Sequence, residues 1–411
     1  MIKKKIAVIG GGASGLCAAI EAVRAGNGRV AVVLYESLGR CGKKILATGN
    51  GRCNLANTDT DLAHYYGDTS LVQAVFTHVS PQSTLDFFRE LGLFLRADMA
   101  GRVYPLSNQA SAVLDALRFE VSRLGVDVVT ETKITDIKPQ GDVWLLNDMY
   151  TADCVILACG GKAAPVHGSD GTGYLLAKQL GVSVTPILPA LAPLRIEQFP
   201  KALKGIRAEG SLTVKCAGKV LAVSAGEIQY TDYGLSGIPA MQVSGAVARC
   251  LADKDKKPCQ IIVDRAPSVS AEELANYIEH AKKVRPGLLC EDLLTGMMPK
   301  RLGGTVLTEV SVQPQKPLTA INAGVIPALV ACIKSKKYKA AAVCGFNEAQ
   351  VTAGGIPAAE IDGNTLCLHK ADRVFVCGEL VNVDGDCGGY NLLWAWSSGR
   401  LAGMNAANSV L

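Results

Sequence analysis

A glycine-rich turn between an apolar strand and an apolar helix, near the start of the chain, constrains the fold most. Residues 6–9 read Ile-Ala-Val-Ile, and residues 10–15 read Gly-Gly-Gly-Ala-Ser-Gly. In this G-x-G-x-x-G pattern Gly10 permits a tight turn, Gly12 lets the backbone approach a diphosphate, and Gly15 lets the helix pack closely on the strand. A helix is expected over residues 14–25, with its N–H groups and positive dipole end facing the phosphates.

An acidic residue at the end of a second expected strand supports the same interpretation. Residues 30–35 are apolar and Glu36 follows them directly, 21 positions after Gly15. A carboxylate in this place accepts hydrogen bonds from ribose hydroxyls. Because strand, helix, second strand and acid occur in register, we interpret the glycines as a dinucleotide site and not as a chance turn.

The rest of the N-terminal region alternates strands and helices, as a doubly wound sheet does. Ser80 and Pro81 begin one expected helix, and apolar residues at helical spacing predict another over 110–124. Strands are expected at 126–130, 133–137 and 143–146, and a buried strand that ends in paired glycines is expected at 154–161.

The pattern changes after a group of three prolines between residues 186 and 193. Residues 194–264 are typical of short strands with glycine turns, as in a small sheet or barrel. A capping box formed by Ser270 and Glu273 then begins a helical region that extends to about residue 336. Strands are expected again from Ala340.

Composition narrows the functional class. The longest uncharged apolar run, residues 317–333, contains Asn322, Gly324 and Pro327, so we expect no membrane span. The apolar stretch after the N-terminal lysines is only about four residues long before the glycines, too short for a secretory signal. We therefore expect a cytoplasmic protein.

The cysteines and histidines indicate neither a disulfide framework nor a metal site. None of the 14 cysteines forms C-x-x-C, and the five histidines lack ligand spacing. We expect mostly buried thiols in a reducing compartment. The net charge of +5 is mild and the lysine cluster at 254–257 is interpreted as a solvated turn, so nucleic acid is not an expected partner. The oligomeric state is left open.

Three further segments combine glycine with polar residues: 42–57, 160–174 and 378–392. The last one leads into an apolar helix, so it offers a second helix N-terminus to a ligand. The motifs T-G-N-G-R-C-N-L-A-N (48–57), G-R-V-Y-P (101–105), G-L-S-G (234–237), V-T-A-G-G (351–355) and D-G-D-C-G-G-Y-N (384–391) occur in this order. In this combination and order the chain resembles the BaiN/YhiN-type bacterial flavoprotein family, whose members are described as NAD(P)/FAD-dependent oxidoreductases, aminoacetone-oxidase-like enzymes or 3-dehydro-bile-acid reductases.

The resemblance implies an α/β fold with a two-part Rossmann-like FAD domain of the glutathione-reductase type, an inserted β-barrel domain and a helical insert. On this chain the FAD domain covers 1–190 plus 351–411, the barrel 191–266 plus 338–350, and the helical insert 267–337. It also implies FAD as the cofactor. The candidate cofactor-binding positions are Gly10, Gly12, Ala13, Ser14, Gly15, Glu36, Ser37, Lys44, Thr48, Gly49, Asn50, Arg52, Cys53, Asn54, Cys159, Gly160, Gly161, Gly378, Glu379, Asp386, Gly389, Tyr390, Asn391 and Leu392. Cys159 departs from the family pattern, which often has Thr there.

A flavin supplies the redox chemistry itself, and the protein supplies placement and electrostatics. We expect reduction of a C=C bond conjugated to a carbonyl, in a hydrophobic small molecule such as a steroid or bile-acid-like 3-oxo-ene, by hydride transfer from flavin N5. Arg52 and Tyr233 are the candidates for stabilising the enolate oxygen. Alternatively, Arg52 holds its own loop and Tyr233 is a turn residue. A disulfide reductase is disfavoured, because Cys41 and Cys53 do not form C-x-x-x-x-C.

The source of electrons and two other functions stay open. No second strand, G-x-G-x-x-G and helix unit is present, so NAD(P)H as reductant would dock transiently over the flavin or share the substrate pocket. One alternative is an FAD-dependent amine oxidase that uses O2. The other is a flavin-dependent RNA-modification or RNA-binding protein.

Overall fold

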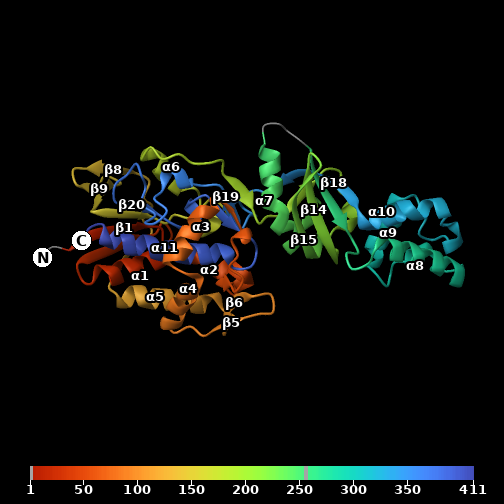
Figure 1. Cartoon of the computed structure of the whole chain (residues 1–411), viewed down its shortest axis with the longest axis horizontal. Coiled ribbons are helices and arrows are strands. Elements are labelled where there is room, and N and C mark those ends of the chain that lie inside the picture. The colour runs from red at the N-terminus through yellow and green to blue at the C-terminus, as the bar shows by residue number, and fades with distance from the viewer. Residues whose placement is uncertain (1–2, 254–257) are drawn as a thin grey trace. The chain divides into compact units, whose positions relative to one another are not determined.

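Five segments of the chain become neighbouring strands of one parallel sheet in the computed structural model, which describes residues 3–253 and 258–411. The sheet has five strands in the order β20 (Val374–Val376), β11 (Cys154–Leu157), β1 (Lys4–Ile9), β2 (Val30–Tyr35) and β7 (Asp127–Val129). Figure 1 labels β1 and β20. Ile6 of β1 pairs with Val32 of β2 on one side and with Cys154 of β11 on the other. Such strands are covered on both faces, which explains why these runs are apolar throughout rather than alternating.

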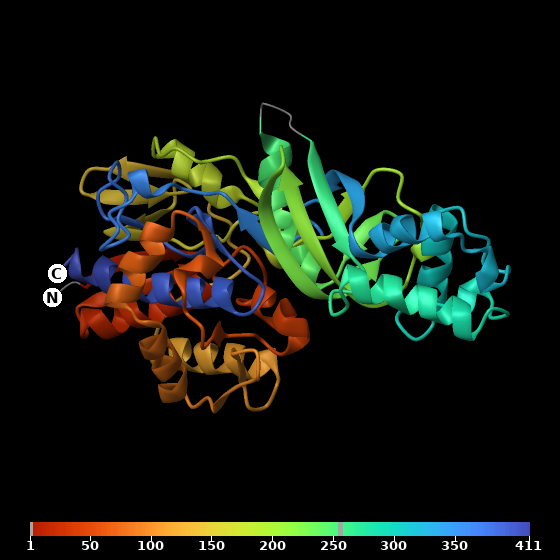
Figure 2. The ribbon, with the colours of Figure 1, turned by 45° about the vertical axis from the view of Figure 1, so that its right-hand side comes forward.

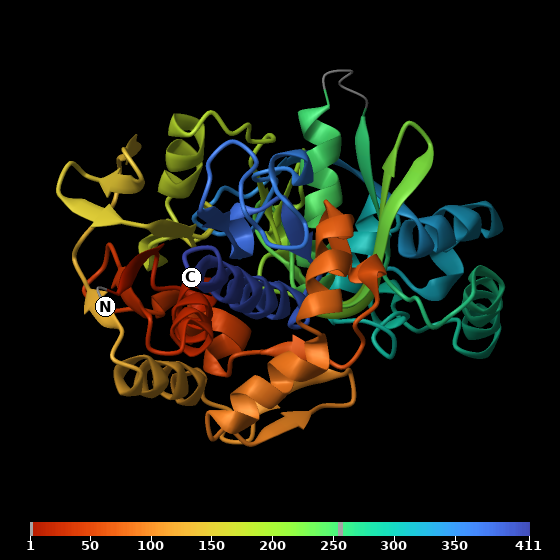
Figure 3. The same cartoon turned by 60° about the vertical axis from the view of Figure 1, so that its left-hand side comes forward.

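Two layers cover this sheet. Helices α1, α5 and α11 lie on one face, and α11 runs alongside α1 (Figure 3). The antiparallel sheet β10-β9-β8 packs on β1 and β11. The mixed α/β fold and the Rossmann-like sheet that the sequence predicts are thereby confirmed.

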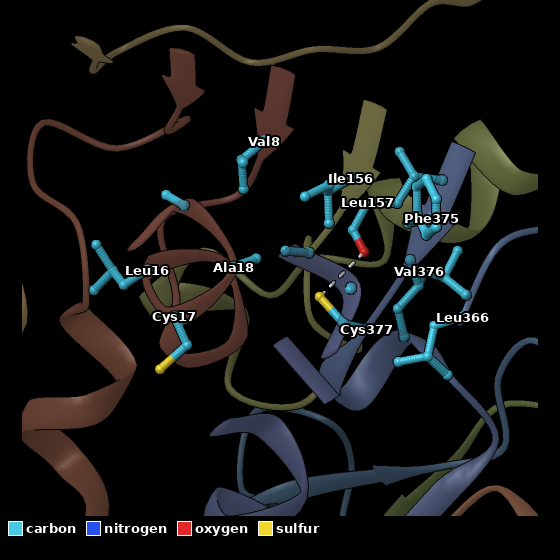
Figure 4. Packing of buried hydrophobic residues seen from close by; sticks show 14 of the residues in the cluster. Val8, Leu16, Cys17, Ala18, Ile156, Leu157, Leu366, Phe375, Val376 and Cys377 are labelled. Atoms are coloured by element: carbon cyan, nitrogen blue, oxygen red, sulfur yellow. Dashed lines mark hydrogen bonds between the residues drawn. The ribbon is translucent and has the colours of Figure 1, made fainter. Parts of the chain in front are cut away.

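Side chains from β1, β11, β20 and α1 form a single buried cluster (Figure 4). Val8, Ile156 and Val376 come from the three adjacent strands and are fully buried. The Cys377 thiol donates a long hydrogen bond of 3.9 Å to the Leu157 carbonyl oxygen in the same cluster. Burying each such side chain is worth about 1.5–3 kcal/mol, so this cluster fixes the strand ends that carry the glycine-rich loops.

Glycines let the helices from the two ends of the chain approach each other closely. A Cβ at Gly399 of α11 would lie 2.3 Å from the Ser14 carbonyl oxygen, and one at Gly403 would lie 2.3 Å from the Ala18 carbonyl oxygen. No side chain larger than hydrogen fits at these positions without moving one helix. The C-terminal helix therefore completes the packing of the helix that begins at the N-terminal glycine motif.

The chain divides into two compact units. The first comprises Met1–Leu188 and Gln350–Leu411, and the second comprises Pro189–Ala349. The barrel strands and helices α8 to α10 fall in the same unit, and the separation of a barrel domain from a helical insert stays a prediction. The lysine cluster at 254–257 lies outside the described residues.

The second unit contains a closed barrel with the strand order β13-β16-β15-β14-β17-β18. Helix α7 packs against β15, β14 and β18, and α8, α9 and α10 form a group of helices in the same unit (Figure 2). The expected capping box is confirmed: the Ser270 hydroxyl accepts from the Glu273 N–H at 3.1 Å, and the Glu273 carboxylate accepts from the Ser270 N–H at 2.8 Å.

The elements of the first unit begin and end as follows: β1 Lys4–Ile9, α1 Ala13–Gly26, β2 Val30–Tyr35, α2 Lys43–Ala47, β3 Ala56–Asn57, β4 Tyr65–Gly67, α3 Thr69–His78, α4 Pro81–Glu90, β5 Leu95–Ala97, β6 Arg102–Pro105, α5 Ala110–Arg123, β7 Asp127–Val129, β8 Ile137–Gln140, β9 Val143–Leu146, β10 Tyr150–Ala152, β11 Cys154–Leu157, α6 Thr172–Gln179, β19 Val351–Ala353, β20 Val374–Val376, β21 Val383–Gly385 and α11 Tyr390–Asn408. Strand β12, Leu188–Ala190, lies at the boundary. The second unit contains β13 Leu194–Ile196, β14 Arg207–Cys216, β15 Lys219–Tyr230, β16 Gly234–Ser236, α7 Ile238–Ala252, β17 Cys259–Asp264, α8 Ala271–Val284, α9 Lys300–Glu309, α10 Ile326–Lys334 and β18 Lys336–Val343.

Two sequence predictions of strand positions are wrong. Residues 133–136 are not a strand, because the Asn147 amide side chain bonds the backbone of Lys133, Thr135 and Asp136 and takes the place of a strand partner. The strand expected from Ala340 begins earlier, at Lys336, since β18 already pairs with β17 at Lys336, two residues after α10 ends.

The close contact between α1 and α11 predicts that Gly403→Ala destabilises the protein. The added methyl group must push the helices apart, and overpacking of this kind costs roughly 1–3 kcal/mol. Calorimetric unfolding measures the change. Gly304→Ala in α9 is the matched control, because a Cβ there meets nothing within 4 Å among the described residues, and alanine in an open helix position stabilises by up to about 1 kcal/mol. Equal effects of the two substitutions would contradict the packing argument.

Candidate cofactor site

The glycines of the N-terminal motif have three different environments. Gly10 has φ +107°, and a Cβ there would lie 2.5 Å from the Ala158 carbonyl oxygen. A Cβ at Gly15 would lie 1.8 Å from the Gly10 carbonyl oxygen, so α1 touches the turn itself. A Cβ at Gly12, by contrast, would have no heavy atom of the described residues within 4 Å. Gly10 and Gly15 are therefore required by the fold, whereas Gly12 faces open space.

Helix α1 begins in this open space without a side-chain cap. Gly12 is its N-cap residue and makes no side-chain hydrogen bond, and Ala13 and Ser14 follow in the first turn. The first N–H groups of a helix need a partner from outside the helix, and they carry the positive end of its dipole. The start of α1 can therefore hold an anion such as a diphosphate.

Glu36 lies beside the same turn. Its carboxylate accepts hydrogen bonds from the Gly11 N–H at 2.9 Å, the Leu38 N–H at 2.8 Å and the Ser37 hydroxyl at 3.2 Å. These donors fix the carboxylate at the end of β2. This is the placement that the sequence predicts for an acid that binds a ribose.

A second carboxylate, that of Glu379, connects four separate segments. It accepts from Lys44 Nζ of α2 at 2.8 Å and from the Thr352 N–H of β19 at 2.9 Å. The Thr352 hydroxyl in turn accepts from the N–H groups of Lys162 and Ala163 at 2.8 and 3.0 Å. The V-T-A-G-G motif thus meets the expected flavin segment through Thr352, whose role the sequence did not single out.

The loop after β11 approaches this network closely. A Cβ at Gly161 would lie 2.4 Å from Thr352 Oγ1 and 2.5 Å from Glu379 Oε1. Gly160 has φ +71°, a conformation that glycine adopts readily. The Cys159 thiol donates to the Ile9 carbonyl oxygen at 3.4 Å. All three candidate residues therefore sit at the carboxyl ends of β1 and β11, where open α/β sheets bind ligands.

The T-G-N-G-R-C-N loop contains left-handed residues close together. Asn50 and Cys53 have φ +55° and +56°, and Gly49 has φ +57°. Non-glycine residues in this region cost free energy and tend to cluster at functional sites. Thr48 holds the turn, since its hydroxyl donates to the Ile45 carbonyl oxygen at 2.6 Å and its carbonyl accepts from the Cys53 N–H at 3.1 Å.

Three side chains of this loop have distinct surroundings. Cys53 is fully buried, and burial raises its thiol pKa to about 12, which disfavours the thiolate form. Arg52 donates from Nε to the Gly49 carbonyl oxygen at 3.2 Å and lies over the Tyr104 ring at 5.1 Å. Asn54 Oδ1 is buried and has no hydrogen-bond partner among the described residues. An unpaired buried acceptor of this kind is suited to a ligand N–H.

The C-terminal motif, residues 384–391, contacts the loop of residues 48–57. Gly389, the N-cap residue of α11, comes so close that a Cβ there would lie 2.3 Å from the Ala56 carbonyl oxygen. The Asn57 amide donates to the Gly388 carbonyl oxygen at 3.0 Å. Trp394 and Trp396 of α11 donate from their indole nitrogens to the carbonyl oxygens of Gly378 and Leu55 at 2.9 and 3.1 Å.

Helix α11 also begins without a side-chain cap. Asn391 uses its amide within the motif, donating to the Gly385 carbonyl oxygen at 2.7 Å and accepting from the Gly385 N–H at 2.8 Å. Leu392 is partly buried against the core. This first turn, which starts at Tyr390, is where the sequence predicts a second anion- or carbonyl-binding helix terminus, and that role stays a prediction.

A histidine that the sequence analysis did not single out lies at this helix terminus. His64 Nδ1 is 2.9 Å from Asp386 Oδ2, and its ring stacks on Tyr390 with a centroid distance of 4.4 Å. Asp386 and His64 are 322 residues apart in the chain. No local pattern marks the pair, so only the fold reveals it.

Tyr233 belongs to the second unit, unlike every other candidate. Arg195 lies over its ring at 4.7 Å. Burial raises the pKa of its hydroxyl, with Cys344 as a neighbour that raises it further. Its proposed part in catalysis stays a prediction.

The residues of the first unit fit FAD. The open space over Gly12 and the start of α1 would take the diphosphate, and Glu36 would take the adenosine ribose. The start of α11 and the unpaired Asn54 acceptor suit the polar edge of a flavin ring. The family motifs around residues 48–57, 101–105, 351–355 and 384–391 all meet in this region. The fold and this site define a Rossmann-type FAD-dependent oxidoreductase.

Comparison with known proteins agrees with this class. Residues 4–405 match the family model described as "HI0933-like protein Rossmann domain", and the chain belongs to this HI0933-like family. The resemblance to BaiN-type flavoproteins is thereby confirmed.

Curated relatives match over almost the whole chain. The chain is 38% identical over 408 residues to the 3-dehydro-bile acid delta(4,6)-reductase of Clostridium scindens. This alignment covers 98% of this chain and 99% of that protein. It is 25% identical over 403 residues to the ribosomal RNA dihydrouridine synthase of Haemophilus influenzae, and 25% identical over 401 residues to that of Escherichia coli. Each of these two alignments covers 95% of both chains.

Within residues 3–253 and 258–411, no helix has the length and apolar character needed to cross a membrane. All 14 cysteines are free thiols, and ten of them are buried. The expectation of mostly buried thiols is confirmed.

The open space at Gly12 predicts that Gly12→Val removes the cofactor and spares the fold. The new side chain occupies the diphosphate position, and we expect FAD affinity to fall by at least about a hundredfold, or about 2.7 kcal/mol. Titration of the apoprotein with FAD measures the affinity, and circular dichroism checks the fold. Gly15→Val is the contrasting variant, because its side chain collides with the Gly10 carbonyl oxygen and should unfold the unit. Wild-type FAD affinity in folded Gly12→Val would refute the assignment.

Proposed function

We propose that the protein reduces a carbon–carbon double bond conjugated to a carbonyl group, in a hydrophobic small molecule such as a bile-acid-like 3-oxo-ene. The observation that carries this proposal is the 38% identity to a 3-dehydro-bile acid delta(4,6)-reductase across nearly the full length of both chains. The more distant relatives support the same bond type. Dihydrouridine is uridine with its ring C=C bond saturated, and that bond is conjugated to a carbonyl.

Bound FAD would supply the hydride for this reduction, and the chain's own residues would place the substrate and stabilise charge. We propose Arg52 as the donor for the carbonyl oxygen, where negative charge develops. Its Nε is engaged with Gly49 and its plane rests on Tyr104, which holds the guanidinium in one orientation. Its terminal nitrogens make no hydrogen bond within the described part of the chain, so they can donate to a substrate.

We propose NAD(P)H as the electron donor. The chain has one G-x-G-x-x-G unit, and we assign it to FAD. NAD(P)H and the substrate would therefore use the same pocket in turn, which gives ping-pong kinetics.

Reduction of a uridine in ribosomal RNA is the second candidate. The two relatives named ribosomal RNA dihydrouridine synthase favour this function, and so does the distribution of charge. Residues 189–349 contain 21 Lys and Arg residues against 14 Asp and Glu residues, a formal net charge of +7, although the whole chain carries only +5. A basic unit is the electrostatic property that RNA binding requires.

Anaerobic reoxidation of the photoreduced flavin separates these functions. We expect a 3-oxo-4-ene steroid to reoxidise the flavin rapidly and to gain two hydrogens by mass spectrometry. Reoxidation by unmodified ribosomal RNA alone, with dihydrouridine formed, would establish the second candidate. Peroxide formation from an amine such as aminoacetone in air, without reduction of either substrate, would instead indicate an amine oxidase.

The orientation of Arg52 predicts a loss of rate when its donors are removed. Arg52→Gln should lower kcat by about a hundredfold, as removal of one oxyanion donor does, at nearly unchanged FAD affinity. Stopped-flow reoxidation by the enone measures the step. Arg96→Gln is the matched control, because Arg96 is an exposed arginine of the same unit that bonds only Asn108 among the described residues. An Arg52→Gln rate within twofold of wild type would exclude the proposed role.

A further inference from the structure

We propose that His64 is a positioning residue: as an imidazolium held between Asp59 and Asp386, it fixes the loop that begins α11 and so strengthens FAD binding. This inference rests on the proposed placement of FAD at the start of α11. It concerns the affinity for the cofactor and not the identity of the substrate.

Both ring nitrogens of His64 face carboxylates. Nδ1 lies 2.9 Å from Asp386 Oδ2, and Nε2 lies 3.0 Å from Asp59 Oδ2. A neutral imidazole has one N–H donor, whereas the imidazolium has two. Only the charged form can donate to both carboxylates, since the neutral ring would turn a lone pair toward one of them. The geometry therefore selects the cation.

Asp386 is the link between His64 and the cofactor loop. Its second oxygen accepts from the Tyr66 hydroxyl at 2.8 Å, and its backbone N–H donates to the His64 carbonyl oxygen at 2.9 Å. Strand β4, which follows His64, pairs with β21, which precedes Asp386. The Asn391 amide donates to the Asp386 carbonyl oxygen at 3.2 Å. His64 thus acts on a carboxylate that is already tied into the turn before α11.

Ring stacking holds the other end of the turn before α11, at Tyr390. The His64 ring lies on the Tyr390 ring at 4.4 Å between centroids and 21° between planes, and a cation is attracted to the face of an aromatic ring. Tyr65 packs edge-on against Tyr390 at 5.7 Å, and its hydroxyl donates to the Tyr390 carbonyl oxygen at 3.3 Å. Tyr390 is the first residue of α11, so His64 contacts the turn at both ends.

The surroundings favour protonation of His64. Burial alone would lower its pKa, but the hydrogen bonds to Asp386 and then Asp59, together with their charges, outweigh burial and raise the pKa above 6.5. The titratable groups that face this cluster are those of Asp59, Tyr65, Tyr66, Asp386, Cys387 and Tyr390. A raised pKa in the folded protein means that the stabilising effect is complete below about pH 6.5 and is lost as the pH rises through the folded value.

The first test is the affinity of the apoprotein for FAD as a function of pH, followed by flavin fluorescence. We expect the wild-type affinity to fall by about tenfold as pH rises from about 6 to about 9. His64→Gln should bind FAD about tenfold more weakly at the low end of this range, with little further change as the pH rises. His78→Gln is the matched control, because His78 is an exposed histidine of the same unit whose ring bonds the neutral Asn364 side chain.

Asp59→Asn is the second variant and keeps the inference testable if His64→Gln does not fold. The Asp59 side chain is 61% exposed, and asparagine keeps an acceptor while removing the charge. Its affinity profile should have the wild-type shape but should shift to lower pH, because His64 loses one of its two carboxylates.

The outcomes are separable. A pH-independent wild-type affinity, or a His64→Gln profile that matches wild type, would overturn the role of His64. If His64 were only structural, its substitution would shift apoprotein unfolding and leave the FAD affinity independent of pH. Failure of the wild-type protein to bind FAD at any pH would instead remove the proposed function on which the inference rests.

Discussion

The backbone contact between α1 and α11 is the interaction on which the rest of the cofactor site depends. Gly399 and Gly403 allow α11 to lie against Ser14 and Ala18 with no side chain between the helices. This contact places the middle of α11, at Gly399, next to the first turn of α1, where Ser14 would also touch any Cβ at Gly378. The diphosphate end and the flavin end of the predicted site are therefore built from opposite ends of the chain, and both are held by one helix pair.

The polar groups of the site are arranged around this pair in separate clusters. Glu36 fixes the turn at α1, Glu379 joins α2 to β19, and Asp386 joins His64 to the start of α11. Each carboxylate is hydrogen-bonded within the protein, so its orientation is set before any ligand arrives. Preorganised groups of this kind lower the cost of binding because little ordering remains to be done. The uncapped ends of α1 and α11 are left for the cofactor.

Local patterns allowed much of the fold and of the cofactor site to be predicted from the sequence. The glycine motif, the strands around it and the capping box at Ser270 each depend on residues close together in the chain, and the structure has them. The strand expected at 133–137 failed because a single amide, that of Asn147, reaches back to bond its backbone. The roles of His64 and Thr352 could not be found, because their partners Asp386 and Ala163 lie 322 and 189 residues away in the chain. Such roles depend on tertiary contacts, and no periodicity or propensity records them.

The three tryptophans of the chain, Trp144, Trp394 and Trp396, all belong to the first unit, and two of them lie buried on α11. The indole of Trp394 bonds Gly378, and that of Trp396 bonds Leu55, so both emitters are attached to the segments that would surround the isoalloxazine ring. Tryptophan emission from this protein consequently originates in the Rossmann-like unit alone, and the second unit contributes only tyrosine emission. The chain thus contains an intrinsic optical probe of its own cofactor occupancy, through energy transfer from indole to flavin, without any added label.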